Sequence, residues 1–202
     1  MSLAAPRVRS YVSGMSSSSA WLVAAALLLG ACGPKEAPAH GPTRLEPISA
    51  APSFSVPDET GKTRTLAEFR GRPVVLYFYP KDGTPGCTRE ACAFRDEWQR
   101  IEAAGAQVLG VSLDSVESHA AFKQQHHLPF PLLSDTDGKV LEAYGVTRNA
   151  KGYASRTTFI IDAEGIIRRI FPEVDPAVHV KEVLGVLEVM KRQGLDRGQP
   201  RR

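Results

Sequence analysis

The apolar positions of the chain follow two patterns, short uninterrupted runs and longer runs with helical spacing. The uninterrupted runs RPVVLYFY (residues 72–79) and AQVLGVSLD (106–114) are rich in β-branched and aromatic residues, which predicts strands buried on both faces of a sheet. Near the end of the chain, PAVHVKEVLGVLEVMKR has the spacing of an amphipathic helix. The residues of its apolar face are Val180, Val183, Leu184, Leu187 and Met190.

Shorter elements are expected between these segments. Helical spacing runs from about residue 87 to 103, and a capped helix is expected over 115–127, where Ser115 opens the segment. KVLEAYGV predicts a further short helix. PFPLLSD is expected to be an edge strand, because its prolines cannot donate in the middle of a sheet. TTFIIDAEGIIRRIF predicts two strands joined by a turn at DAEG.

This order of elements indicates the fold class. Alternating strands and helices, followed by a hairpin and a closing helix, are typical of an α/β sandwich with a central mixed sheet flanked by helices. A cysteine that follows the first central strand and opens a helix is the arrangement of a thioredoxin-like fold. We expect this domain over residues 52–193 and a flexible tail over residues 194–202.

Length and composition allow one domain with a hydrophobic core. The chain has 202 residues, of which 43% are hydrophobic, so it does not need disulfides to compensate for a small core. Charged residues make up 23%, and the formal net charge is +3. So mild a balance, without a clustered basic face or a nucleic-acid motif, gives no case for nucleic-acid binding.

The beginning of the chain has the composition of an export signal followed by a linker. Arg7 and Arg9 precede the apolar run AWLVAAALLLG, which at about ten residues is too short for the roughly 20 that span a bilayer. The segment LGAC, ending at Cys32, is similar to the lipobox of bacterial lipoproteins, in which the cysteine becomes the lipidated first residue. We therefore expect a signal peptide over residues 1–31 and a Pro/Ala-rich tether over residues 32–51.

This interpretation predicts an exported protein that is anchored to a bacterial membrane by lipid on Cys32. Several acyl chains would hold it stably, because each buried CH₂ contributes about 0.8 kcal/mol. Two alternatives stay open. The apolar run could be an uncleaved anchor with an incidental cysteine, and Met15 could be a second start, although a start there would discard both arginines.

The other two cysteines, Cys87 and Cys92, lie five positions apart in YFYPKDGTPGCTREACAFRD. Cys87 follows the turn residues KDGTPG and is expected in the first turn of a helix, where unpaired N–H groups and the helix dipole favour a thiolate. Five helical positions separate two Cα atoms by about 8.6 Å, whereas a disulfide needs about 6.8 Å or less. The two cysteines can therefore bond only if the helix locally unwinds.

Metal binding is not predicted. Structural zinc requires closely spaced cysteines with two further ligands at matched spacing, and the sequence has no second such pair. No organic cofactor is expected either. The histidines at four helical positions are interpreted as surface or helix-face residues without a role. These are His119, His126, His127 and His179.

The segment PKDGTPGCTREAC resembles the peroxidatic-site motif of peroxiredoxins, P-x₃-T-x₂-C, with Pro80, Thr84 and Cys87 in register. The second cysteine, Cys92, is similar to that of the bacterioferritin-comigratory, or Q-type, subfamily of atypical two-cysteine peroxiredoxins. SRTTFIID resembles the strand that supplies the family's active-site arginine, which maps to Arg156. The resemblance covers the whole predicted domain and implies the thioredoxin-like fold.

The resemblance also implies a thiol peroxidase for hydrogen peroxide and organic hydroperoxides. Cys87 would attack the peroxide and become a sulfenic acid, which condenses with Cys92 after the helix opens. Arg156 would stabilise the thiolate and the leaving oxygen, Thr84 would orient the peroxide, and Pro80 would shield the sulfur. An external dithiol such as thioredoxin would regenerate the enzyme, which is expected to be a monomer.

Other interpretations stay open at this point. Cys87 could be a buried inert thiol, and Cys92 could be a core residue of a one-cysteine enzyme. A membrane-tethered thiol–disulfide oxidoreductase of similar fold would prefer C-x-x-C, and a copper-delivery protein would need C-x₃-C with a suitably placed histidine. This chain has C-x₄-C, a spacing that favours the peroxidase.

Overall fold

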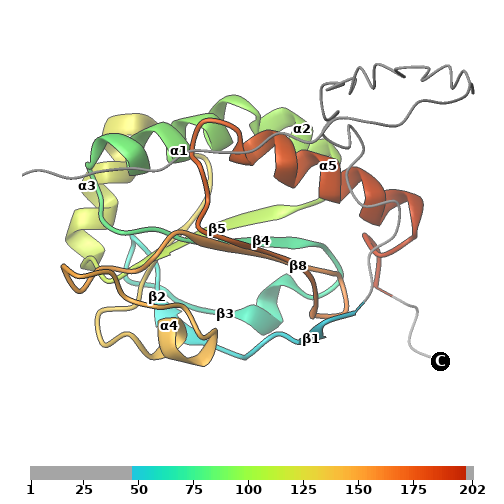
Figure 1. The fold of residues 1–202 in the computed structure, drawn as a ribbon, viewed down its shortest axis with the longest axis horizontal. Coiled ribbons are helices and arrows are strands. Elements are labelled where there is room, and N and C mark those ends of the chain that lie inside the picture. The colour runs from blue at the N-terminus through green and yellow to red at the C-terminus, as the bar shows by residue number, and fades with distance from the viewer. Residues whose placement is uncertain (1–46, 199–202) are drawn as a thin grey trace, which may run out of the picture. The chain divides into compact units, whose positions relative to one another are not determined.

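A computed structural model describes residues 47–198, so Cys32 and the predicted signal peptide lie outside the described residues. The chain forms a six-stranded sheet with the order β1-β8-β7-β4-β5-β6 and a two-stranded sheet of β2 and β3 (Figure 1). The strands are β1 Ser49–Ala50, β2 Ser55–Pro57, β3 Thr63–Thr65, β4 Val74–Phe78, β5 Gln107–Ser112, β6 Leu132–Ser134, β7 Thr157–Ile161 and β8 Ile166–Pro172. The helices are the 3₁₀ helix η1 Leu66–Phe69, α1 Pro85–Asp96, α2 Trp98–Ala103, α3 Val116–His126, α4 Lys139–Ala143 and α5 His179–Arg192.

The six-stranded sheet is mixed, as the sequence predicts. β4 pairs in parallel with β5 and antiparallel with β7, so that Tyr77 lies opposite Gly110 on one side and Thr158 on the other. β6 pairs in parallel with β5 at one edge, and β7 and β8 form the expected hairpin. The strand order confirms the edge position that the prolines of PFPLLSD predict.

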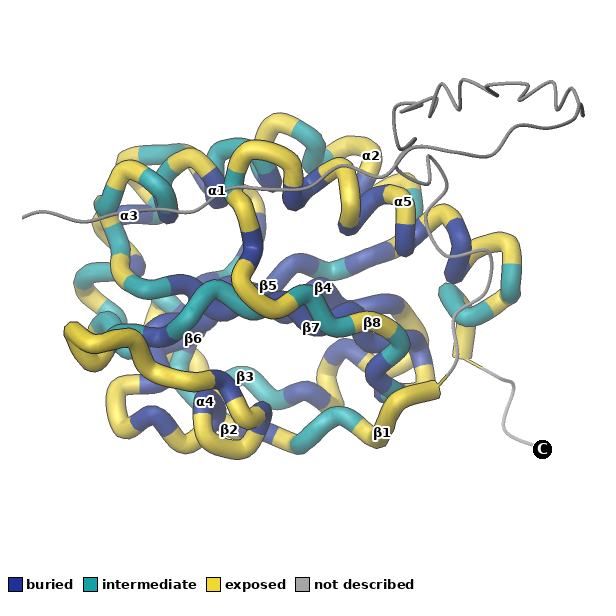
Figure 2. Tube along the Cα trace, in the orientation of Figure 1, coloured by how far each residue is buried: buried dark blue, intermediate teal, exposed yellow. Residues whose placement is uncertain are grey.

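Two hydrophobic clusters cover opposite faces of this sheet. The side chains of β4 alternate between them: Val75 and Tyr77 pack with α1, α2, α3 and α5, whereas Leu76 and Phe78 pack with η1 and α4. Figure 1 shows the same two layers of helices around the sheet, and in Figure 2 the central strands are mostly buried. All five residues predicted for the apolar face of α5 are buried. The core therefore positions α1 against the face that carries Tyr77.

The helix expected over residues 87–103 is divided into α1 and α2. The break falls at Glu97, whose backbone has φ −96° and ψ 10°. Its amide donates to the carbonyls of both Ala93 and Arg95, a shared hydrogen bond that is common at helix ends. The apolar spacing continues across this break, which is why the sequence pattern alone predicts a single helix.

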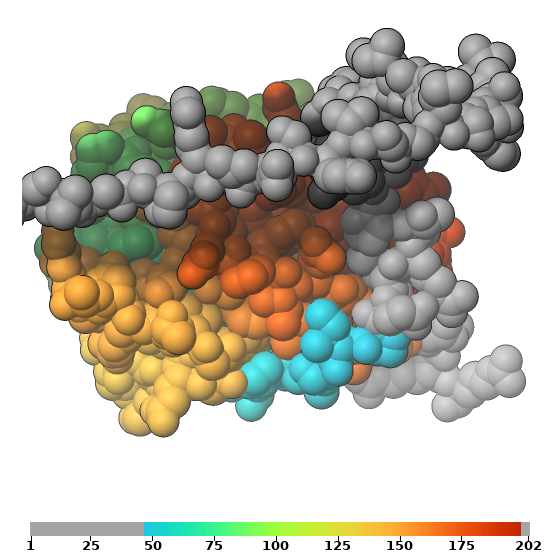
Figure 3. Space-filling model, viewed as in Figure 1, coloured from blue at the N-terminus to red at the C-terminus, as the bar shows by residue number. Residues whose placement is uncertain are grey.

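The ordered domain extends beyond residues 52–193 at both ends. Strand β1 falls within the predicted tether and pairs with β8, and Figure 3 shows β1 on the surface beside residues of the C-terminal half. In the predicted tail, the amide of Leu195 donates to the carbonyl of Met190, and its own carbonyl accepts from Ala163. Leu195 also packs against the core, which ties the segment after α5 to the domain.

Candidate active site

Cys87 lies where the sequence predicts it, in the first turn of α1. Thr84 is the N-cap residue, with an extended backbone, and Pro85 is the first helical residue, where a missing N–H costs no hydrogen bond. Cys87 is the third helical residue, and only 1% of it is exposed. Its sulfur therefore stands at the positive end of the helix dipole.

Arg156 immediately precedes β7 and reaches across to α1. Its Nη2 donates to the Sγ of Cys87 at 3.3 Å, and its Nη1 donates to Oε2 of Glu90 at 2.7 Å. Gly86 leaves room for this approach, because a Cβ built there would lie 2.7 Å from Nη2. The guanidinium therefore places a positive charge directly beside the sulfur, at a position that only a glycine in α1 permits.

Glu90 is a site residue that the sequence analysis did not single out. It is fully buried, and its Oε1 has no hydrogen-bond partner among the described residues. Burial raises the pKa of Glu90 to about 7, although the charge of Arg156 and its hydrogen bond act in the opposite direction. Its local pattern is that of any surface glutamate in a helix. What distinguishes Glu90 is its contact with Arg156, which lies 66 positions away in the sequence. The residues next to Glu90 in the sequence do not indicate this contact.

The remaining two motif residues lie in the loop that leads into α1. Oγ1 of Thr84 donates to the carbonyl of Lys81 at 3.1 Å, which leaves its oxygen lone pairs free to accept another hydrogen bond. Pro80 is half-buried and follows Tyr79, whose amide donates to Val111 in β5. The structure thus brings the predicted residues of the peroxidatic motif to the N-terminal end of α1.

Cys92 lies in the same helix as Cys87, and both are free thiols. The helix is continuous from Pro85 to Asp96, and Cys92 is half-buried within it. An intact helix keeps Cα atoms at this spacing about 8.6 Å apart, beyond the roughly 6.8 Å that a disulfide spans. The structure therefore shows the arrangement in which the two sulfurs cannot join.

Two histidines that we expected at the surface are buried. His119 and His179 are both 0% exposed, so the interpretation as surface residues was wrong for them. Each is buried because it has a polar partner from another element: Nδ1 of His119 lies 2.8 Å from Asp82, and Nε2 of His179 lies 2.9 Å from Thr158. For His179, burial lowers the pKa to about 4.

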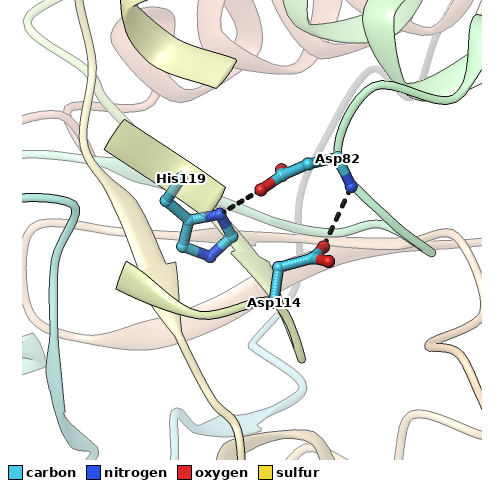
Figure 4. A group of neighbouring side chains, drawn as sticks. All are labelled: Asp82, Asp114 and His119. Atoms are coloured by element: carbon cyan, nitrogen blue, oxygen red, sulfur yellow. Dashed lines mark hydrogen bonds and ion pairs between the residues drawn. The ribbon is translucent and has the colours of Figure 1, made fainter. Parts of the chain in front are cut away.

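Asp82, Asp114 and His119 form a group within residues 47–198 whose ligand atoms lie within 4.8 Å of one another, close enough to hold a metal ion (Figure 4). These atoms already have protein partners. Asp82 accepts from His119, and Oδ2 of Asp114 accepts from the amide of Asp82 at 2.9 Å and from Ser112 at 2.6 Å. The group is therefore a hydrogen-bonded cluster, called the Asp82 cluster below.

Comparison with known proteins gives consistent matches. Residues 48–170 match the family model described as the AhpC/TSA family. A Coxiella burnetii protein assigned as peroxiredoxin bcp is 51% identical over 149 residues, which cover 71% of this chain and 99% of that protein. The fold is similar to peroxidoxin BcpB from Mycobacterium tuberculosis, with 34% identity, a TM-score of 0.68, and coverage of 73% of this chain and 99% of that one. It is also similar to the bacterioferritin comigratory protein of Xanthomonas campestris, with 35% identity, a TM-score of 0.65, and coverage of 71% and 96%.

The fold is thioredoxin-like, with a cysteine at a helix N-terminus and an arginine that donates a hydrogen bond to its sulfur. These features define the class of protein as a thiol-dependent peroxidase. The chain belongs to the AhpC/TSA family and is a peroxiredoxin of the bacterioferritin-comigratory, or Q, type. It reduces peroxides at the expense of a thioredoxin-like reductant. These findings confirm the predicted fold class and reaction, and they favour the peroxidase over the oxidoreductase and copper-delivery alternatives.

Proposed function

We propose that Cys87 is the nucleophile of this peroxidase. Its thiolate attacks the terminal oxygen of the peroxide, the O–O bond breaks, and the sulfur becomes a sulfenic acid while the leaving oxygen takes a proton to give an alcohol or water. The observation that carries the assignment is the 3.3 Å contact between Nη2 of Arg156 and the Cys87 sulfur. No other cysteine of the described chain opens a helix beside an arginine.

The neighbouring residues have roles that follow from their chemistry. The guanidinium of Arg156 stabilises the thiolate before attack and the negative charge on the leaving oxygen during it. Thr84 orients the peroxide by accepting a hydrogen bond at its hydroxyl oxygen, whose lone pairs are free. Pro80 stiffens the loop, because its ring fixes φ, and shields the sulfur from water. These assignments rest on the position of all three residues at the N-terminal end of α1.

Cys92 completes the cycle as the resolving cysteine. Its thiol attacks the sulfenic sulfur, a disulfide forms, and water leaves with the sulfenic oxygen. An external dithiol then reduces the disulfide by two exchange steps and is itself oxidised to a disulfide. The free thiols and the continuous α1 support a reduced state from which the helix must unwind before the second step.

The substrates proposed for this chain are hydrogen peroxide and organic hydroperoxides. The bacterioferritin comigratory protein of Xanthomonas campestris has alkyl peroxide reduction activity, which supports the organic class. The reductant is a thioredoxin-like dithiol, and the working unit is a monomer, since both cysteines of the cycle lie in one helix of one chain. Light scattering during turnover tests this: the measured mass should be that of one chain, and the mass of two chains would contradict the monomer.

Replacement of each cysteine separates the two steps. Cys87→Ser is expected to abolish peroxide consumption, because serine at neutral pH supplies no comparable nucleophile. Cys92→Ser is expected to form sulfenic acid on Cys87 with the first equivalent of peroxide and sulfinic acid with further peroxide, both detected by mass spectrometry. Normal turnover by Cys87→Ser would refute the nucleophile, and sustained cycling by Cys92→Ser with the same dithiol would remove Cys92 from the mechanism.

We also propose that the protein is exported and lipid-anchored to a bacterial membrane, at the periplasmic or outer face, through Cys32. The lipobox-like LGAC and the Pro/Ala-rich stretch after it support this. Within the described range 47–198, no helix is both long and apolar enough to cross a bilayer. Mass spectrometry of the full chain from bacterial membranes should show an acylated N-terminus at Cys32, absent from Cys32→Ala. A mature N-terminus at another residue would contradict the anchor.

A further inference from the structure

The Asp82 cluster holds the loop before α1 from several elements at once. Oδ1 of Asp82 accepts from the hydroxyl of Tyr79 at 2.7 Å, at the end of β4. Its Oδ2 accepts from Ser118 at 2.7 Å and from Nδ1 of His119 at 2.8 Å, both in α3. Its backbone amide donates to Asp114, just after β5, at 2.9 Å (Figure 4). The loop is therefore fixed to three neighbouring elements.

Both ring nitrogens of His119 have polar partners. Its Nδ1 lies 2.8 Å from the carboxylate of Asp82 and 3.3 Å from the hydroxyl of Tyr79, and its Nε2 lies 3.1 Å from the carbonyl of Leu133. These contacts on both sides of the ring fix its orientation. The side chains of His119 and Asp82 are 0% and 6% exposed, so the two form a buried, hydrogen-bonded pair.

The acidic group of this pair is held as a carboxylate. Burial alone would raise the pKa of Asp82, but its interactions with His119, together with the hydroxyls of Tyr79 and Ser118, lower it below its ordinary value. Asp114 is the second carboxylate in the cluster, and it faces the amide of Asp82 rather than the histidine. The cluster therefore keeps Asp82 able to accept hydrogen bonds from two elements at once.

None of these partners belongs to α1, yet the loop they hold leads directly into it. Asp82 lies two residues before the N-cap Thr84, and Cys87 is the third residue of the helix. The residues after Cys87 must unwind for the disulfide to form. The hydrogen bonds of the Asp82 cluster described above go to β4, β5 and α3 and not to these residues. The fold thus separates a fixed anchor before the sulfur from a segment that changes after it.

We propose that the hydrogen-bonded pair Asp82–His119 is a positioning device for the peroxide-reducing step, which holds the loop and the first turn of α1 so that Cys87 stays beside Arg156. The proposal rests on the nucleophile role given above to Cys87. The pair acts through the loop and does not touch the sulfur. It should therefore govern the attack on peroxide and leave the later disulfide-forming step alone.

The test measures the two steps separately in the full chain by stopped-flow fluorescence. His119→Gln and Asp82→Asn should each slow sulfenic acid formation by about tenfold or more, because small displacements of a reacting group cost that much. The rate of disulfide formation from the sulfenic acid should stay unchanged. The double variant should be no slower in the first step than the slower single variant, because both substitutions break the same contact.

Matched controls distinguish positioning from general stability. His179→Gln removes another fully buried histidine that lies outside the cluster, and it should leave the first step unchanged. If His119→Gln does not fold, Ser118→Ala removes one neutral hydrogen bond to Asp82 and should give a smaller loss in the same step.

Three results would overturn the proposal. One is normal sulfenic acid formation in folded His119→Gln or Ser118→Ala. Another is an equal loss in His179→Gln, and the third is an equal slowing of the disulfide-forming step in His119→Gln. Inactivity of every variant together with a fully active Cys87→Ser would instead show that the proposed nucleophile is wrong. The two failures are therefore distinguishable.

Discussion

The two cysteines of α1 share one helix but differ in their surroundings. Cys87 is 1% exposed and receives a hydrogen bond from Arg156. Cys92 is half-buried, and the arginine near it, Arg95, divides its hydrogen bonds between Cys92, Asp96 and the carbonyl of His126, the last at 2.8 Å. The folded helix thus prepares one sulfur for reaction with peroxide. The other sulfur becomes its partner only when the helix opens.

Substitution of Arg156 is expected to have the largest effect on the difference in reactivity between Cys87 and Cys92. Arg156→Gln should lower the second-order rate constant for peroxide by about a hundredfold to a thousandfold, the usual cost of removing a preorganised donor to a developing negative charge. Arg156→Lys should recover only part of the loss, because a single ammonium cannot contact both Cys87 and Glu90 as the forked guanidinium does. Stopped-flow traces of the first step measure this. An unchanged rate constant in Arg156→Gln would show that the sulfur does not need the contact.

A smaller effect is expected from Gly86. In Gly86→Ala the new Cβ would lie 2.7 Å from Nη2 of Arg156, so the end of the arginine must move away from the sulfur. We expect the first step to slow by about tenfold, since misplacement by a fraction of a bond length has this cost. Thermal unfolding should change little, because a flexible side chain moves rather than backbone.

Gly185→Ala is the matched control for this substitution. Gly185 also lies in a helix, α5, and a Cβ there meets nothing within 4 Å. Its peroxide rate should equal that of the wild type, and its stability should rise slightly, because alanine is the better helix former. Equal rates in Gly86→Ala and Gly185→Ala would show that the close approach of Arg156 is irrelevant to catalysis.

The smallest expected effect is a pH dependence of the unwinding step that comes from Glu90. Burial raises the pKa of Glu90 to about 7 in the folded helix, whereas the ordinary pKa of a glutamate is 4.5. The folded helix therefore binds more protons between these values, and its stability relative to the unwound segment falls as pH rises from about 4.5 to about 7. Disulfide formation from the sulfenic acid should accelerate severalfold over this window and level off above it.

Glu90→Gln checks the origin of that dependence. The variant keeps the size of the side chain but cannot ionise, so the ratio of its rate to the wild-type rate should change across the window. The other ionisable groups that face Glu90 are Cys87, Arg156 and Tyr77, and they are present in both proteins. A constant ratio from pH 4.5 to 7 would assign the pH dependence to a group other than Glu90.

The strands, most helices and the motif residues could be predicted from the sequence because local patterns determine them. Uninterrupted apolar runs give β4 and β5, and turn residues followed by a cysteine locate the start of α1. The two-residue strand β1 and the break at Glu97 were not predictable in this way. The first depends on pairing with β8 far along the chain, and the second leaves the apolar spacing unchanged.

The parts of the site that sequence analysis missed share one physical cause. Glu90, Asp82 and His119 are polar residues whose burial depends on partners from distant segments. A histidine or glutamate in a helix is ordinarily exposed, and nothing in its neighbours reveals an opposite charge across the fold. The motif and the strand resemblance indicated the reacting sulfur and its arginine. The polar pairs that support them, Arg156–Glu90 and His119–Asp82, form only once the chain is folded.

Hydrogen exchange of the reduced and oxidised protein tests the central claim most directly. In the reduced protein, the amides of residues 88–92 should be protected by the hydrogen bonds of α1. After one equivalent of peroxide, with the Cys87–Cys92 disulfide verified by mass spectrometry, those amides should exchange freely while the loop held by the Asp82 cluster stays unchanged. Equal protection of residues 88–92 in both forms, with the disulfide present, would contradict the account.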